Sequence, residues 1–166
     1  MSNETDTKDS PEATLARLRS RVKSVQLSTL GEDGEPHSGY TPFLDDSGCL
    51  VIFVSQLSLH TRDLLANGKV SAMLIADESD SEQLFARTRV SYQCQAQQVL
   101  PSDENYETLL DRFQDEHGKI MQLLRQLPDF VLFRLVPSKG QFVMGFGQAY
   151  KLTGENLDQF EHAQSA

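Results

Sequence analysis

Apolar residues recur in short runs along most of the chain, and turn sequences separate the runs. Some runs alternate apolar and polar positions, which is typical of a strand with one buried face. The run at 49–55 is almost continuously apolar, which is typical of a strand buried on both faces. The predicted strands are 25–30, 38–44, 49–55, 70–76 and 87–100, and turns are predicted at 31–36 and 45–48.

Helical spacing predicts three further segments. The first helix, 12–22, starts after a capping serine and Pro11, a favoured helix beginning. A second short helix covers 57–66 and ends at Asn67-Gly68. A helical region from 101 to 126 is interrupted near Gly118. Its spacing predicts one apolar, structural face made by Tyr106, Leu109, Leu110, Phe113, Ile120, Leu123 and Leu124.

The C-terminal quarter predicts a last hairpin and a tail. Residues 130–136 and 141–144 would pair around a turn at Pro137–Gly140, and 147–152 would extend the pairing. Short strands with few helices predict a mainly β protein, a closed barrel with added helices. We expect one domain at 11–154, after a disordered segment at 1–10. A short polar tail at 155–166 carries His162, placed to close over a ligand held by the body of the protein.

Charge and composition restrict the classes of molecule that this protein is expected to bind. The formal net charge of −9 disfavours nucleic acid and anionic membranes, because both repel an acidic surface. No apolar run is long enough to span a bilayer, and the polar N-terminus does not resemble a signal peptide. Cys49 and Cys94 are isolated thiols that indicate neither a zinc site nor a disulfide framework. A cytoplasmic location is therefore expected.

Several motifs resemble a known family. The segment Ser55-x-Leu-Ser-x-His60-Thr-Arg-Asp-Leu64, followed by Asn67-Gly-Lys-Val-Ser71, resembles the FMN-binding split barrel of pyridoxamine phosphate oxidase-like proteins. Three features resemble its haem-utilisation branch, the HugZ/HutZ type. They are His60 in place of a lysine of the flavin-binding members, the run Leu84–Val90, and Asp129-Phe with Gly-Phe-Gly-Gln-Ala-Tyr and His162.

The resemblance implies a homodimer of split β-barrels that binds haem at the subunit interface and opens it oxidatively to a biliverdin-type product. His162 matches the family's axial iron ligand. Asp129 matches the acid that the other protomer supplies to hydrogen-bond that histidine, and Arg89 matches a basic residue that supports the haem. Degradation would release the iron, and the sequence does not specify the electron donor.

The residues alone leave two interpretations open at each position. His162 is either an iron ligand or a solvated tail residue, and Asp129 is either functional or a turn residue that caps local amides. Arg87 and Arg89 are two residues apart, so they would share one side of a strand and could bind haem propionates. They could equally protect a strand edge. His60 could line the cofactor cavity or satisfy local hydrogen bonds.

Three functions are consistent with these residues. The first is a haem oxygenase-like enzyme that coordinates haem iron through His162. The second is an FMN-dependent oxidoreductase of the same fold. His60 argues against it, but Arg62 and Lys69 remain available for a flavin phosphate. The third is a non-catalytic haem storage or delivery protein, which would use the same residues as the enzyme.

Overall fold

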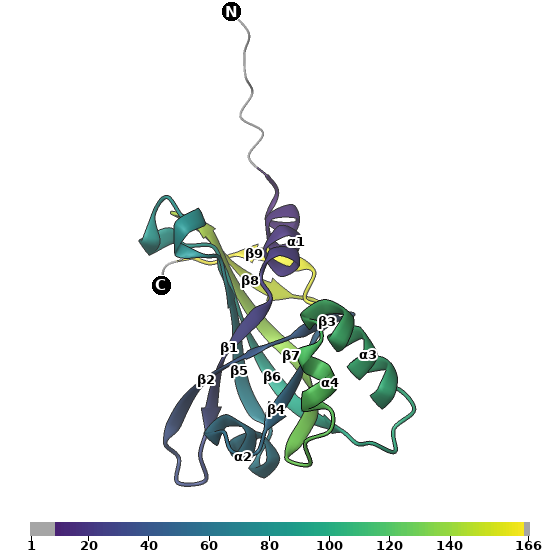
Figure 1. Ribbon diagram of the computed structural model, residues 1–166. Coiled ribbons are helices and arrows are strands. Elements are labelled where there is room, and N and C mark those ends of the chain that lie inside the picture. The colour runs from purple at the N-terminus through teal and green to yellow at the C-terminus, as the bar shows by residue number, and fades with distance from the viewer. Residues whose placement is uncertain (1–8, 165–166) are drawn as a thin grey trace, which may run out of the picture.

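A computed structural model describes residues 9–164. Within these residues the strands form one antiparallel sheet in the order β2-β1-β5-β6-β7-β4-β3, and β8 and β9 are attached beside β7 (Figure 1). The strands are β1 (Ser24–Leu30), β2 (Pro36–Pro42), β3 (Leu44–Asp46), β4 (Cys49–Ser55), β5 (Lys69–Ile75), β6 (Arg89–Val99), β7 (Phe130–Gly145), β8 (Gln148–Thr153) and β9 (Gln159–His162). The helices are α1 (Pro11–Arg21), α2 (Leu59–Ala66), α3 (Tyr106–His117) and α4 (Ile120–Leu124), with short 3₁₀ turns η1 (Glu78–Asp80) and η2 (Leu84–Ala86).

The long strand β7 organises the sheet. It pairs with β6 on one side, and on the other with β4 along its first half and β8 along its second half. The predicted turn at Pro137–Gly140 is therefore wrong, because these residues lie inside one continuous strand. The pairing with β6 shifts register there, so the segment is a bulge. Pro137, which has no N–H to donate, lies in the gap between the β4 and β8 pairings.

The barrel interior contains most of the buried apolar side chains. The alternating strands direct these side chains inward, and β4 contributes an almost fully buried run, as its sequence predicted. The largest fully buried side chains of this core include Phe133, Phe142, Leu27, Leu50, Ile52 and Leu74. Helix α1 packs Leu15 and Leu18 against this core. The helix begins after Ser10, whose side chain accepts a hydrogen bond from the N–H of Ala13.

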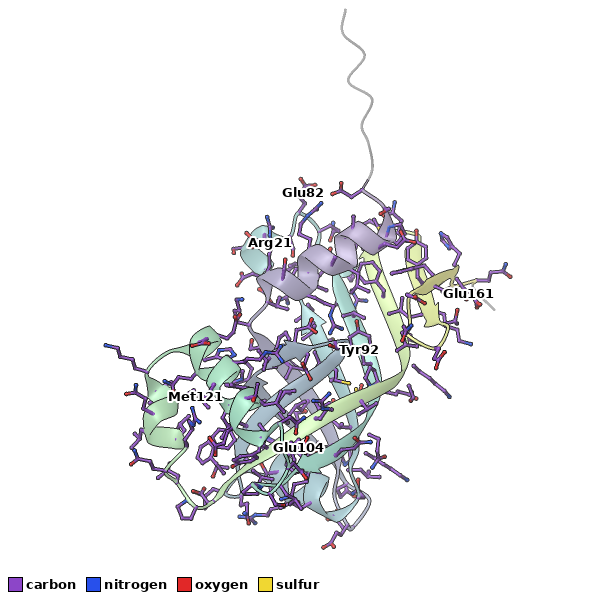
Figure 2. The ribbon with its side chains drawn as sticks, turned by 90° about the vertical axis from the view of Figure 1, so that its right-hand side faces the viewer. Arg21, Glu82, Tyr92, Glu104, Met121 and Glu161 are labelled. Atoms are coloured by element: carbon purple, nitrogen blue, oxygen red, sulfur yellow. The ribbon has the colours of Figure 1, made fainter. Side chains whose placement is uncertain are left out.

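A second apolar cluster lies between the β3–β4–β7 part of the sheet and the pair α3–α4. Leu109, Leu110 and Phe113 are buried there, which confirms the structural role predicted for this region. Ile120 and Leu123 are exposed, so their prediction as members of the same apolar face is wrong. The chain reverses at Gly118, which has a φ of 87°, and α4 buries Met121 instead (Figure 2).

Part of the polar tail belongs to the sheet, as the edge strand β9 (Gln159–His162). Strand β9 pairs with β8, placing His162 opposite Tyr150 and Phe160 opposite Leu152. Phe160 packs edge-on against Phe142 and Tyr150, with ring centroids 6.1 Å apart in both contacts. The disorder predicted for 1–10 falls largely outside the described residues, and the part inside them, Asp9 and Ser10, leads directly into α1.

Candidate functional site

His162 ends the edge strand β9. Its imidazole ring lies against the Tyr150 ring, with centroids 4.9 Å apart and planes inclined by 57°. The next residue continues the pairing, because the N–H of Ala163 donates to the carbonyl of Ala149 at 2.8 Å. The His162 side chain is exposed and forms no hydrogen bond with any other residue in 9–164. An ordered, exposed imidazole without a protein partner is chemically available to bind a metal centre.

A groove of about 620 Å³ lies beside this histidine. Its volume is within the range of small-molecule sites, about 300–1,000 Å³. Strands β5 to β9 all contribute to its walls, and the lining includes Ser71, Ser91, Lys139, Gln141, Lys151 and His162. The sheet therefore brings residues from distant parts of the sequence next to His162, the residue that the sequence predicted to contact a ligand.

Asp129 lies immediately before β7, at the other end of that strand. Its carboxylate accepts a hydrogen bond from the Ser55 hydroxyl, and its carbonyl accepts one from the N–H of Gln56. The residue of β7 next to β8 and His162 is Phe142, roughly 40 Å along the strand at about 3.3 Å per residue. A single chain therefore does not bring Asp129 and His162 together.

The two arginines predicted to share one side of a strand have different surroundings. Arg87 precedes β6, and its Nε donates to the carbonyl of Ala76 at 2.6 Å. It lines a different cleft, between α1 and the sheet. Arg89 begins β6 and donates from Nη1 to the carbonyl of Arg87 at 2.9 Å. It pairs with Val143, which does line the groove beside His162.

His60 lies in the first turn of α2, at the same end of the molecule as Asp129 and opposite to β8 and β9 (Figure 1). The ring packs against Gly39 of β2, where an added Cβ would lie 2.4 Å from His60 Nδ1. Burial lowers the pKa of His60, more strongly than the nearby Asp63 carboxylate raises it. The imidazole is therefore neutral at pH 7 and tightly packed.

A buried polar cluster next to His60 did not emerge from the sequence. The Asp63 carboxylate accepts a hydrogen bond from Thr29 at 2.6 Å and lies 2.7 Å from His37 Nδ1. Burial raises the pKa of Asp63. The hydrogen bonds from Thr29 and His37 lower it by more than burial raises it, so the net shift of the pKa is downward. A signal was present at Thr29, because a polar residue at an inward-facing position of a strand requires an interior partner.

Comparison with known proteins identifies the family. A family model described as pyridoxamine 5'-phosphate oxidase matches residues 11–144. The chain belongs to this family. Members of this family have the split-barrel fold. The family match and the similar solved structures therefore confirm the mainly β split barrel predicted from the sequence.

Relatives within the oxidase family place the chain in its HutZ-type haem-utilisation branch. It is 37% identical over 153 residues to heme oxygenase HutZ of Vibrio cholerae, covering 92% of this chain and 87% of that protein. A crystal structure of HutZ, described as the heme storage protein from Vibrio cholerae, has a TM-score of 0.77 and 32% identity, covering 89% of this chain and 99% of that one. Campylobacter jejuni ChuZ has a TM-score of 0.81 and 29% identity, covering 92% of this chain and 61% of that one.

Residues 9–164 lack two features. No helix within 9–164 is both long and apolar enough to cross a membrane. The same residues contain no group of three or more histidine, cysteine, aspartate or glutamate side chains arranged to hold a metal ion.

Proposed function

We propose that this protein binds haem through His162 and degrades it oxidatively to a biliverdin-type product, with release of iron. The observation that supports this most directly is the ordered, exposed imidazole of His162, beside a groove of about 620 Å³ and without a protein partner in 9–164. The naming of a 37% identical relative as a heme oxygenase supports the same ligand and reaction.

In this proposal haem is the substrate, and its iron supplies the site at which O₂ is reduced. The macrocycle is oxidised, and an external electron donor supplies the additional electrons. His162 holds the iron with one ring nitrogen, which must be unprotonated. The Tyr150 ring, tilted against the imidazole with its centroid 4.9 Å away, limits the rotation of His162. A carboxylate that accepts the other ring N–H would fix the tautomer and raise the basicity of the ligand.

Asp129 is the carboxylate that we assign to that role, acting from a second protomer. Its distance from His162 along β7, roughly 40 Å, excludes this contact within one chain. A homodimer in which the β8–β9 end of one protomer meets the α2 end of the other would supply it. The exposed aromatic side chain of Tyr40 on β2, which is 65% exposed, supports such pairing, because a second protomer could cover it.

Two other functions remain as alternatives. A haem storage or delivery protein would use the same ligand, and the description of one HutZ structure as a heme storage protein favours testing it. The oxidase family match keeps FMN as a competing ligand. The protein would then act as a flavin oxidoreductase, and His162 would not be required for ligand binding.

An absorption titration with haemin, and a parallel one with FMN, tests the proposal. Wild type should give a sharp Soret band that saturates at one haem per protomer, and His162→Ala should lose it. Gln159→Ala changes an exposed residue of the same strand and is the matched control. Ascorbate in air should then bleach the band and produce a biliverdin-like spectrum.

Three results would redirect the assignment. A stable Soret band that ascorbate does not bleach would favour storage or delivery over degradation. Stoichiometric FMN binding with only diffuse haemin binding would replace the haem proposal by the flavin oxidoreductase. An unchanged Soret band in His162→Ala would show that another residue holds the iron.

A further inference from the structure

Two exposed apolar patches lie at opposite ends of the molecule. The first, called the tip, consists of Leu84, Phe85 and Phe146, and the second, called the α2 patch, consists of Leu57 and Leu59 at the start of α2. All five side chains are more than half exposed, and Phe85 is 87% exposed. The teal η1–η2 segment lies at the upper end with β8 and β9, and α2 lies at the lower end (Figure 1). Apolar side chains gathered on a surface indicate an interaction site.

The tip adjoins the end of the sheet that carries His162. It is formed where η2 contacts the end of β7, and Phe146 lies in the turn between β7 and β8. His162 pairs with Tyr150, which is four residues after Phe146. The tip is therefore roughly 13 Å from the His162 pairing, at about 3.3 Å per residue along the strand.

The α2 patch adjoins Asp129. The N–H of Leu57 donates to the Ser55 hydroxyl at 3.1 Å, and that hydroxyl donates to the Asp129 carboxylate. Each patch thus lies beside one member of the proposed contact between Asp129 and His162. A dimer that joins the β8–β9 end of one chain to the α2 end of another also brings a tip to an α2 patch.

The charges beside the two patches are of opposite sign. Arg62 is three residues after Leu59, on the same side of α2, and its guanidinium donates to a backbone carbonyl. It shares a hollow with Glu32 and Asp33 but forms no ion pair with any residue in 9–164. Glu82 lies at the tip between η1 and η2, and it too has no ion-pair partner in the described part of the chain (Figure 2). Opposite charges at the rim of a contact favour its orientation.

We propose that the tip of each protomer packs on the α2 patch of a second copy of this chain. Twofold symmetry repeats the contact, so the dimer covers two tips and two α2 patches. This assignment rests on the proposed function, which sets the orientation of the two chains. The packed apolar side chains exclude water beside the hydrogen bond that His162 donates to Asp129, and a drier surrounding strengthens that bond.

Phe85→Lys and Leu57→Glu test this contact by sedimentation of the full chain over a range of concentrations. Each variant alone should weaken dimerisation by roughly tenfold or more, because a charge is buried against an apolar partner. A one-to-one mixture should recover the dimer. In the mixed dimer one contact joins the introduced lysine to the introduced glutamate, and the other contact is native. Ile120→Lys changes an exposed apolar residue of α4 outside both patches and should leave dimerisation unchanged.

The outcomes separate this contact from the proposed function. Dimerisation as strong in both variants as in wild type would overturn it. Loss in both variants without recovery in the mixture would also overturn it, because like ends would then meet. Phe146→Lys and Leu59→Glu repeat the test at a second residue of each patch if a variant has an altered circular dichroism spectrum. Recovery in the mixture without a His162-dependent Soret band would support the contact and overturn the haem assignment alone.

Discussion

At the scale of single residues, Asp63 is a charged side chain enclosed in the interior. It is 6% exposed, and its hydrogen bonds to Thr29 and His37 connect β1, β2 and α2. A buried carboxylate is tolerated only when its hydrogen-bonding capacity is satisfied. This cluster therefore holds α2, with His60, against the sheet, at the end of the molecule that also contains Asp129.

The pKa of Asp63 predicts how stability depends on pH. Folding lowers the pKa of Asp63. Ionised Asp63 therefore stabilises the folded state at pH values above its pKa in the unfolded chain, about 4. This stabilisation is lost as the pH falls through the lower pKa of the folded state. Asp63→Asn should lower the free energy of unfolding by about 1–3 kcal/mol at pH 7. The difference from wild type should shrink towards pH 3.

Urea unfolding followed by circular dichroism at both pH values measures this effect. Glu32→Gln is the control, because Glu32 is an exposed acid of the neighbouring turn and should change stability little at either pH. A difference between wild type and Asp63→Asn that stays constant from pH 7 to pH 3 would show that ionisation of Asp63 does not contribute.

At the scale of elements, β9 is the strand that places His162. It is only four residues long and has one neighbour, so its hydrogen bonds to β8 do not hold it alone. The aromatic contacts of Phe160 with Phe142 and Tyr150 attach it to the barrel core. The same packing that completes the core thus determines where the imidazole lies.

Removing that aromatic contact should release the strand. Phe160→Ala should cost about 2 kcal/mol, less than the roughly 3–5 kcal/mol of a fully buried phenylalanine, because Phe160 is half-buried. Hydrogen exchange should become faster at the amides of β9 and at Ala163, whose N–H is bonded to Ala149, while the middle of β7 stays protected. Gln159→Ala should leave all these rates unchanged. Equal protection of β9 in Phe160→Ala would show that its backbone pairing suffices.

At the scale of the whole molecule, the proposed site requires two chains. Asp129 and His162 lie at opposite ends of β7, so the proposed contact is possible only between protomers. The proposal predicts a particle of about twice the 18.6 kDa chain mass. Light scattering coupled to size-exclusion chromatography measures it, and a monomer at the concentrations used for haem binding would contradict the shared site.

Mixing two inactive variants distinguishes a shared site from a site within one chain. In a heterodimer of His162→Ala with Asp129→Ala, a shared site leaves one site with both residues intact and one with neither. Ascorbate-driven haem bleaching should therefore recover when the variants are co-refolded, to about a quarter of wild type for random pairing. A site within one chain would leave every site with one lesion, and mixing would restore nothing.

The sequence by itself determined strands β1, β4, β5 and β6, the start of α1 and the branch of the family. These features depend on local patterns: apolar alternation, the Ser10 cap, and motifs such as Ser55 to Leu64. The sequence also singled out His162. The prediction that Arg87 and Arg89 share one side of a strand was less accurate. Arg87 lies before the first residue of β6, and outside a strand the direction of a side chain does not follow strand alternation.

Only the tertiary structure decided how distant segments meet. Pro137–Gly140 has the composition of a turn, yet pairing of β7 with β4, β6 and β8 keeps it extended as a bulge. The contact between Asp63 and His37 depends on how α2 packs against β2, and the adjacency of Lys139 and Lys151 depends on sheet register. No local pattern encodes either. Register is set by long-range packing of whole strands, and for that reason the walls of the site could not be read from the sequence that predicted its histidine.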